Sequence, residues 1–344
     1  MLPYFLVYFL LVLSCLFGKA NKNERVLIIP ITILIIFAGF RYNVGVDYGE
    51  YVEQFSKEVG TENREIGFNF LIDFIIAIGA KPQMLFLICA IVMQMFVYNF
   101  FRTYNFNVWL SLMIYYCVST FYIATFNGVR QYMAIGAFML CLPLIRDRNF
   151  IRFCAVMLVS VLFFHESILI FFPLYFILNK DWSLTFKVCI LVAVILINKS
   201  IDLVLAYTPY LTYATRDRET ELSVFTYVFL AGSFLLILLE NRIRFFKDKR
   251  IFFNINYLNF LLLLLTVIQS EGILKQMYLR LDSYVLFAYI VMIPALLNQI
   301  RSKELKAISY LAFNVGVFLY LVRTIAFHGG EYMLVPYKMN FNLF

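Results

Sequence analysis

Long apolar runs separated by short polar stretches make up most of this sequence. A helix needs about 20 predominantly apolar residues to cross the hydrocarbon core of a bilayer, and most of the runs approach that length. The runs lie at residues 2–18, 26–40, 83–101, 108–126, 130–145, 151–165, 167–179, 184–198, 223–239, 252–269, 282–299 and 306–327. The pattern predicts an all-α polytopic membrane protein with about twelve transmembrane helices, and both chain ends outside.

One further apolar segment does not fit as a span. Residues 67–80 form a short run that contains Asp73 and ends before Lys81 and Pro82. Counting this run as a span would place the later basic loops on the wrong side of the membrane. We therefore predict a short re-entrant or interfacial helix at 67–80. A chain of thirteen spans with the opposite N-terminal side is the alternative.

The distribution of basic residues predicts the orientation. Lys and Arg are in excess in four short stretches, 19–25, 146–152, 240–250 and 301–306. By the positive-inside rule these stretches are cytoplasmic. The two longest loops, about 41–66 and 199–222, are acidic overall and are predicted to be extracytoplasmic.

Composition supports this class of protein. The chain is 63% hydrophobic and 15% charged, whereas about a quarter of the residues of a soluble domain are charged. These values exclude a soluble globular domain and a disordered chain. The net charge of +8 is accounted for by the cytoplasmic stretches, so nucleic acid is not expected as a partner. We predict a single integral membrane domain over residues 1–344.

The first candidate site residues follow the second apolar run, in the sequence FRYNVGVDYGEYVEQF. Arg41 ends the run, and Asp47 follows it between Gly45 and Gly49, which permit a tight turn. One interpretation is that Arg41 binds an anionic group just outside the hydrocarbon. The other is that Arg41 is an interfacial arginine at a helix end, beside a solvated acidic loop.

The second candidates are Arg130 and Gln131, which open a helix after Asn127 and Gly128. The N-terminus of a helix carries unpaired N–H groups and a partial positive charge, so an arginine there favours a nearby anion. Phosphate or pyrophosphate would fit, since arginine donates to such groups in a bidentate manner.

The third candidates are His165 and Glu166, between two strongly apolar runs. Ionisable residues at membrane depth are costly and are often functional. An imidazole can act as a general base towards a sugar hydroxyl, and Glu166 could orient it or act as the base itself. Alternatively, this stretch is simply a hairpin turn.

Three further arginines complete the candidates. Arg280 lies in the predicted loop 270–284, at the start of the run 282–299 and in the role proposed for Arg130. Arg216 and Arg218 lie in the loop 199–222. The two histidines of the chain are far apart, and the sequence has no P-loop or HExxH motif. We therefore expect neither a metal site nor a cofactor.

Taken in order, these stretches resemble the EpsG-like family of bacterial polysaccharide polymerases. The resemblance rests on FRYNVGVDYGEYVEQF, VRQYMAIGAFML, FFHESILIFFPLYFIL, LRLDSYVLFAYIVMIPAL and the closing YMLVPYK. Arg41 and Asp47 match the first motif, and Arg130 and Gln131 match the second. His165 and Ser167 match the third motif, and Arg280 matches the fourth.

The resemblance implies an enzyme of the Wzy class, in the inner membrane of a bacterium with its active site facing the periplasm or the exterior. Such enzymes join oligosaccharide repeat units carried on undecaprenyl pyrophosphate, and the lipid pyrophosphate is the leaving group. The resemblance also implies the partners of this protein, which would be the lipid-linked glycans, the bilayer, and a chain-length regulator and a flippase of the same pathway.

Chemical reasoning assigns roles within the candidate set. Arginines at helix ends would stabilise the charge that develops on the pyrophosphate, and a positioned base would deprotonate the acceptor hydroxyl. We predict Arg41, Arg130, Gln131, Arg280, Arg216 and Arg218 to bind substrate, and His165, Glu166 and Asp47 to be catalytic. An O-antigen ligase or another transferase of lipid-linked glycans is the closest alternative, because it would need the same pyrophosphate-binding arginines. A flippase or transporter would instead have polar residues on broken helices near the bilayer midplane.

Overall fold

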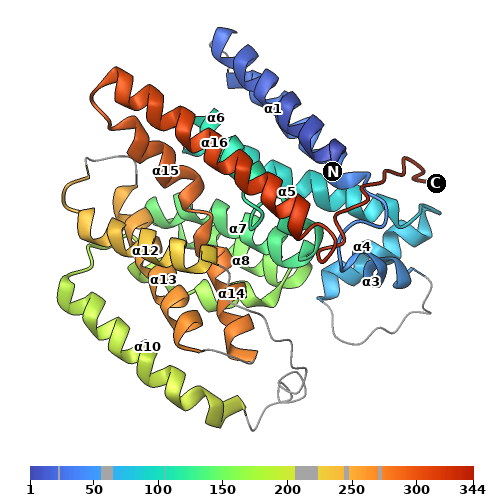
Figure 1. The fold of residues 1–344 in the computed structure, drawn as a ribbon. Helices are drawn as coiled ribbons and strands as arrows, with labels where there is room; N and C mark the ends of the chain where they lie inside the picture. The colour runs from blue at the N-terminus through green and yellow to red at the C-terminus, as the bar shows by residue number, and fades with distance from the viewer. Residues whose placement is uncertain (22–23, 56–64, 105, 206–223, 244–247, 270–272) are drawn as a thin grey trace. The chain divides into compact units, whose positions relative to one another are not determined.

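The computed structural model describes residues 1–21, 24–55, 65–104, 106–205, 224–243, 248–269 and 273–344. These residues are almost entirely helical (Figure 1), with one isolated β-bridge between Arg41 and Met339. The chain divides into two compact units. We call residues 1–172 and 293–344 unit 1, and residues 173–292 unit 2.

Unit 1 is built around α5 (Gln83–Thr103), which packs against both α2 (Ile28–Gly39) and α7 (Val129–Arg146). The other elements of unit 1 pack around these three helices or on one another. These are α1 (Leu2–Asn21), η1 (Glu24–Leu27), α3 (Tyr48–Glu53), α4 (Ile66–Ala77), α6 (Val108–Cys117), η2 (Ile123–Phe126), α8 (Phe150–Phe163), η3 (Glu166–Phe171) and α16 (Lys303–Phe327).

Unit 2 has α13 (Lys249–Ile268) at its centre, packed against α12 (Val224–Leu239), α14 (Ile273–Leu286) and α10 (Leu184–Leu205). It begins with the short α9 (Leu174–Ile177), and α15 (Tyr289–Asn298) leads from it into unit 1.

Three helices among the described residues are long and apolar enough to cross a bilayer, namely α5, α13 and α16. Helices α14 and α15 pass the same test together, bent by 46°. The prediction of a membrane protein therefore holds, while the predicted number of twelve spans is not confirmed.

The structure has fewer long apolar helices than predicted because several apolar runs are divided into shorter helices. The predicted run 108–126 ends as a helix at Cys117 and resumes as the 3₁₀ helix η2. Between them the Tyr122 N–H donates to the Tyr115 carbonyl at 3.1 Å, and the Thr125 hydroxyl donates to the Tyr122 carbonyl at 2.6 Å. Irregular backbone is tolerated in a membrane protein where the protein itself satisfies its polar groups.

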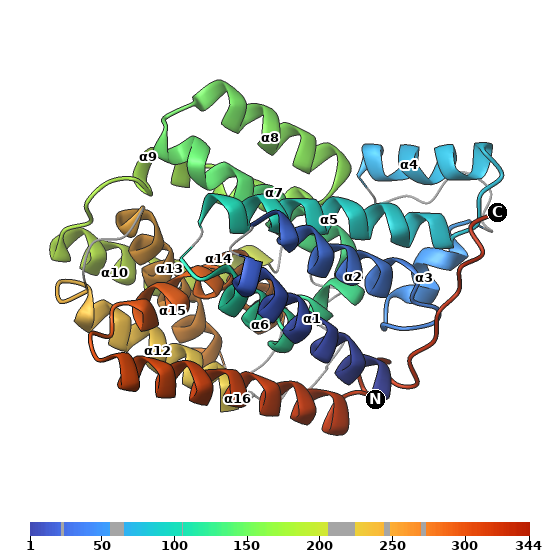
Figure 2. The ribbon, with the colours of Figure 1, turned by 90° about the horizontal axis from the view of Figure 1, so that it is seen from above.

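The segment predicted as a short re-entrant or interfacial helix is a separate helix, α4, of twelve residues. Figure 2 shows α4 lying beside the end of α5. Its buried face includes Phe68, Ile72 and Ile75, whereas Ile66 and Phe70 are exposed. A helix of this length spans about 18 Å, which is too short to cross the hydrocarbon core.

One local expectation is wrong. Residues before 282 were expected to form a loop, with Arg280 at the start of a helix, but α14 already begins at Ile273. Leu274, Tyr278, Asp282 and Val285 recur at helical spacing and are all buried, which explains why the segment is helical.

Candidate functional site

Arg41 directly follows α2 and points into the protein. Its side chain is buried, with the residue only 2% exposed. The Nη1 group donates to the Ala38 carbonyl at 2.8 Å, Nε to the Val44 carbonyl at 3.2 Å, and Nη2 to the Phe126 carbonyl at 3.3 Å. Arg41 therefore ties the end of α2, the following loop and the end of η2 together.

The Arg41 guanidinium lies between two aromatic rings. Its Cζ atom is 4.7 Å from the centroid of Phe86 and 4.9 Å from that of Phe126. Burial lowers the pKa of Arg41 from its ordinary value, and the ring faces partly compensate for lost hydration of the cation. Among the described residues, no carboxylate forms an ion pair with it.

The loop after Arg41 is fitted closely against the end of η2. Gly45 has φ of +99°, and a Cβ atom there would lie 2.6 Å from the Phe126 carbonyl oxygen. The neighbouring Val46 N–H donates to the Asn127 side-chain oxygen at 2.7 Å. The structure thus joins the first predicted motif to the second.

The last residues of the chain also contact Arg41. The β-bridge pairs Arg41 with Met339, and the Tyr42 N–H donates to the Lys338 carbonyl at 2.9 Å. The Tyr337 ring stacks on Phe37 of α2, with centroids 4.1 Å apart, and its hydroxyl donates to the Phe37 carbonyl. The closing motif YMLVPYK is therefore part of the same structure as the first motif.

Arg130 lies in the first turn of α7, as the sequence predicts. It forms an ion pair with Glu65, and the Arg130 and Glu65 side chains are 23% and 10% exposed. The guanidinium also donates to the Tyr51 hydroxyl and lies over the ring of Phe68. The anion expected beside this arginine is therefore present in the chain itself, as a carboxylate.

Not all of the hydrogen-bonding capacity of Arg130 is used. Its Nε atom is buried and has no hydrogen-bond partner within the described part of the chain. A charged donor without a partner is uncommon in a folded protein and calls for a ligand, a water molecule or a change in conformation. Arg130 therefore has a donor left for a further acceptor oxygen.

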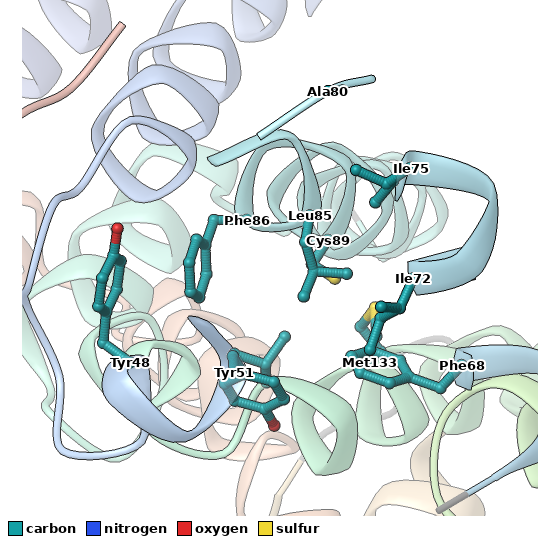
Figure 3. Close-up of a cluster of buried hydrophobic side chains, with 11 residues drawn as sticks. Tyr48, Tyr51, Phe68, Ile72, Ile75, Ala80, Leu85, Phe86, Cys89 and Met133 are labelled. Atoms are coloured by element: carbon teal, nitrogen blue, oxygen red, sulfur yellow. The ribbon is translucent and has the colours of Figure 1, made fainter. Parts of the chain in front are cut away.

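Figure 3 shows a cluster of buried side chains. Arg41 lies over the Phe86 ring of this cluster, and Arg130 lies over its Phe68 ring. Tyr48 of α3 stacks on Phe86 of α5 with centroids 4.4 Å apart, and Tyr51, Phe68 and Met133 belong to the same cluster. Burial raises the pKa of the Tyr51 hydroxyl, although Arg130 partly opposes this. Tyr51 therefore stays protonated and can accept from Arg130 while donating elsewhere.

His165 precedes η3, and its Nδ1 atom accepts a hydrogen bond from the Ser167 N–H at 3.1 Å. This bond occupies the basic nitrogen of the neutral ring and leaves the proton on Nε2. His165 is half-buried, and Glu166 is exposed. Phe164, the residue before His165, packs against the same cluster of buried side chains.

The other predicted residues have different outcomes. Asp47 is the residue before α3, and its carbonyl accepts from the Tyr51 N–H at 3.2 Å, while Gln131 is half-buried next to Arg130. Arg280 is exposed on α14 in unit 2. Arg216 and Arg218 lie outside the described residues.

Sequence reasoning missed several residues of this arrangement, above all Glu65, Tyr51 and Gln83. The Gln83 amide donates to the Gly39 carbonyl at 2.6 Å and accepts from the Tyr48 hydroxyl at 3.3 Å. Glu65 was visible only as one acidic residue among several in its loop, and nothing in the sequence marked it as the partner of Arg130.

The fold and this arrangement define a helical membrane protein in which the loop after Arg41 is joined to the segment before Arg130, beside an aromatic cluster. The chain belongs to the EpsG family, whose family model matches residues 24–339. A comparison with characterised proteins gives no match, and neither does a comparison with solved structures. Family membership confirms the resemblance on which the sequence analysis relied, and it supports a role in polysaccharide biosynthesis.

Proposed function

We propose that this protein polymerises oligosaccharide repeat units that are linked to undecaprenyl pyrophosphate. In this reaction the growing glycan leaves its lipid pyrophosphate and is transferred to a hydroxyl of a second lipid-linked unit. The observation that carries the proposal is that Arg41 and Arg130, from two separate motifs of an EpsG-family chain, belong to one connected arrangement.

Arg130 is the residue that fits the leaving group. A pyrophosphate oxygen can accept from the unused Nε–H, while its charge competes with Glu65 for the Nη groups. Charge-assisted bonds of this kind are stronger than neutral ones and strengthen as negative charge develops on the leaving oxygen. Arg130 would therefore stabilise the transition state more than the ground state.

Arg41 has a different role in this proposal. Its three backbone acceptors already fix its orientation, so it contributes a fixed positive charge and holds the loop that carries Asp47. Fixed charges in a site of low dielectric stabilise developing negative charge without reorganisation.

The transfer itself needs a base. The acceptor oxygen forms a bond to the anomeric carbon, the bond from that carbon to the pyrophosphate oxygen breaks, and the pyrophosphate leaves with the electron pair. The proton of the acceptor hydroxyl goes to the base. His165, Glu166 and Asp47 are the proposed candidates, and for His165 the accepting atom is Nδ1, so the Ser167 N–H must first release it.

The remaining features of the proposal come from the sequence. The enzyme would lie in the bacterial inner membrane with about twelve spans, its active site would face the periplasm, and Gln131, Arg280, Arg216 and Arg218 would contact substrate. No metal is expected to be required, so EDTA should leave the rate of polymerisation unchanged in a purified system.

A transporter of lipid-linked glycans is the second candidate function. One observation favours it, namely the bent pair α14 and α15 within an apolar segment, since transporters bind their substrates at broken helices. A ligase that transfers finished glycans would share the chemistry of the proposed polymerase and would differ in its acceptor.

Glycan analysis in cells separates these functions. Arg130→Ala should abolish long-chain glycan on a ladder gel, while single lipid-linked units still reach the outer leaflet. Arg146→Ala is the matched control, because Arg146 lies at the other end of α7 and pairs with its neighbour Asp147. Persistent ladders in Arg130→Ala would contradict the proposal, and units trapped at the inner leaflet would favour the transporter.

A further inference from the structure

Unit 2 contains a group of buried polar side chains that the proposed function does not use. They come from four helices and are at most 5% exposed, namely Ser233 of α12, Asn256 and Asn259 of α13, Asp282 of α14 and Tyr289 of α15. Polar groups buried within apolar helices are costly and usually serve a function. This group also lies where α14 and α15 form the bent pair.

Most hydrogens of this group are already used within it. The Asn259 Nδ2 group donates to the Ser233 hydroxyl at 2.7 Å and to the Tyr289 hydroxyl at 3.1 Å. The Ser233 hydroxyl can donate to the Phe229 carbonyl at 2.8 Å or to the Tyr289 hydroxyl at 2.5 Å, and the Tyr289 hydroxyl can donate to the Asn256 side-chain oxygen at 2.8 Å. The Asn256 Nδ2 group donates one hydrogen to the Ser233 carbonyl at 3.0 Å. Both hydrogens of the Asn259 amide are therefore used.

Two acceptor oxygens of the group have no hydrogen-bond partner among the described residues. They are Oδ1 of Asn259, whose residue is 0% exposed, and Oδ1 of Asp282, whose residue is 4% exposed. Asp282 also forms no ion pair with any residue in the described part of the chain. A buried oxygen without a donor is destabilising, so both oxygens call for a positive ligand.

The packing of α13 and α14 places these two side chains at the same level. Leu262 of α13 and Tyr278 of α14 belong to one hydrophobic cluster. Asn259 lies three residues before Leu262, and Asp282 lies four residues after Tyr278. The two helices follow one another with a short connection and run in opposite directions. Going three residues back along α13 and four residues forward along α14 therefore leads in the same direction in space. Each of these steps is about one helical turn, so both side chains stay on the faces where the helices contact each other.

The chemistry of the two oxygens defines the ligand. A carboxylate and an amide carbonyl are hard oxygen ligands, which bind small cations and do not bind anions. A proton on Asp282 would turn the carboxyl into a donor, and the unpaired Asn259 oxygen is the acceptor that such a donor needs. A sodium ion would satisfy the same two oxygens through coordination.

We propose that Asp282 and Asn259 form a buried site for a small cation, a proton or a sodium ion, with Tyr289 holding Asn259 in place. The site would lie just before the bend between α14 and α15, so that an occupied site favours the bent arrangement. This proposal goes beyond the proposed function and does not depend on it.

Among the described side chains, no charged group of the neighbouring elements forms an ion pair with Asp282. Lys187 of α10 pairs with Glu240, Arg250 of α13 pairs with Asp181, and Lys249 donates to the Ile243 carbonyl. Tyr289 is close enough to interact electrostatically with Asp282. The remaining titratable side chains on these elements are Tyr257 of α13, Tyr227 of α12, Cys189 of α10, and Lys275, Tyr278, Arg280 and Tyr284 of α14, together with Lys199 and Asp202 of α10, whose side chains lie outside the described part of the structure.

Thermal unfolding of the full-length protein in detergent tests the proposal, with Asp282→Asn as the matched variant. In sodium-free buffer above pH 5, the equilibrium constant for folding of the wild type should fall by up to about tenfold per pH unit if Asp282 binds a proton. The comparison is with Asp282→Asn, which lacks this proton. The sign follows because the folded state would hold a proton that the unfolded chain has lost.

A second series replaces choline chloride by sodium chloride at constant pH and ionic strength. A bound sodium ion raises the unfolding temperature of the wild type with increasing sodium concentration and leaves that of Asp282→Asn unchanged. If the wild type and Asp282→Asn respond equally in both series, the proposal is wrong.

Chemical labelling of the unmodified chain covers the case in which Asp282→Asn does not fold. A hydrophobic carbodiimide adds to a protonated buried carboxyl, so mass spectrometry should find the adduct on the peptide that contains Asp282. Labelling should fall as the pH rises, and sodium should protect the site if it is the ligand. Asp73 of α4 is exposed, so a water-soluble carbodiimide should label it, and this labelling is the positive control. Absence of an adduct on Asp282 between pH 5 and 9 would overturn the proposal.

Discussion

Arg41, just after α2, and Arg130, in the first turn of α7, belong to segments that the fold holds together, but their surroundings differ. Arg41 is 2% exposed and donates to three backbone carbonyls, whereas the Arg130 side chain is 23% exposed and pairs with the Glu65 carboxylate. The partners of Arg41 are fixed parts of the backbone, while the partner of Arg130 is a side chain that another anion can replace.

Arg41 and Arg130 look alike in the sequence but have different roles. Arg41 organises the site, so replacing it should mainly lower the stability of the fold. Arg130 retains an Nε without a partner among the described residues, so replacing it should mainly weaken substrate binding.

Arg41→Met should produce the largest loss of stability. It leaves the carbonyls of Ala38, Val44 and Phe126 without their donor, and each buried unpaired group costs about 1–3 kcal/mol. We expect a destabilisation of about 3 kcal/mol or more, measured by thermal unfolding of the purified protein in detergent. Arg146→Met, at a partly exposed position, should change stability by less than about 0.5 kcal/mol. Equal effects of the two substitutions would show that Arg41 is not an organising residue.

Gly45→Ala should have the next largest effect. Its φ of +99° is unfavourable for a residue with a Cβ, and that atom would lie 2.6 Å from the Phe126 carbonyl oxygen. We expect a loss of about 2 kcal/mol. Gly49→Ala is the control, because nothing lies within 4 Å of its Cβ position and it lies in α3, where alanine should be neutral or stabilising by up to about 1 kcal/mol. If Gly49→Ala destabilised as much as Gly45→Ala, the close fit at Phe126 would not be the cause.

Glu65→Gln should strengthen the binding of inorganic pyrophosphate several-fold, as measured by isothermal titration calorimetry. The substitution removes the carboxylate that occupies Arg130 and keeps a side chain of similar shape. Glu304→Gln, at an exposed position on α16, should leave binding unchanged. Unchanged or weaker binding to the Glu65→Gln protein would mean that Glu65 and the anion do not compete.

Tyr337→Phe should have the smallest effect. It removes the hydrogen bond to the Phe37 carbonyl and keeps the stacked ring, so we expect a loss of about 1 kcal/mol in thermal unfolding. Tyr337→Ala should lose clearly more, because it also removes the ring contacts with Phe37 and Tyr4. Equal losses would show that the ring contributes little to holding the closing segment.

The sequence was sufficient for features that depend on local patterns. The run 83–101 became α5 (Gln83–Thr103), residues 67–80 became the short helix α4, and Arg130 lies in the first turn of α7. Hydrophobic periodicity and helix-start signals decide such features within one or two turns of chain. The same reasoning failed for Arg280, since the buried stripe of α14 was interpreted as a loop.

Contacts between distant segments could not be predicted. The pairs Arg130 with Glu65, Arg41 with Phe126, and Arg41 with Met339 depend on how helices pack, and a single sequence carries no local signal for that. The order of motifs indicated that these stretches belong together, but it did not indicate which atoms meet. The acceptors of Arg41 are backbone carbonyls. A motif specifies side chains, so it could not have identified these carbonyls.

The most direct test of the central claim is polymerisation by purified protein in liposomes that contain lipid-linked repeat units. We expect wild type and Arg146→Ala to form long chains. Arg130→Ala should form none, although its unfolding temperature stays within a few degrees of that of the wild type. Long chains formed by a folded Arg130→Ala protein, at a rate close to that of the wild type, would show that Arg130 does not bind the leaving group.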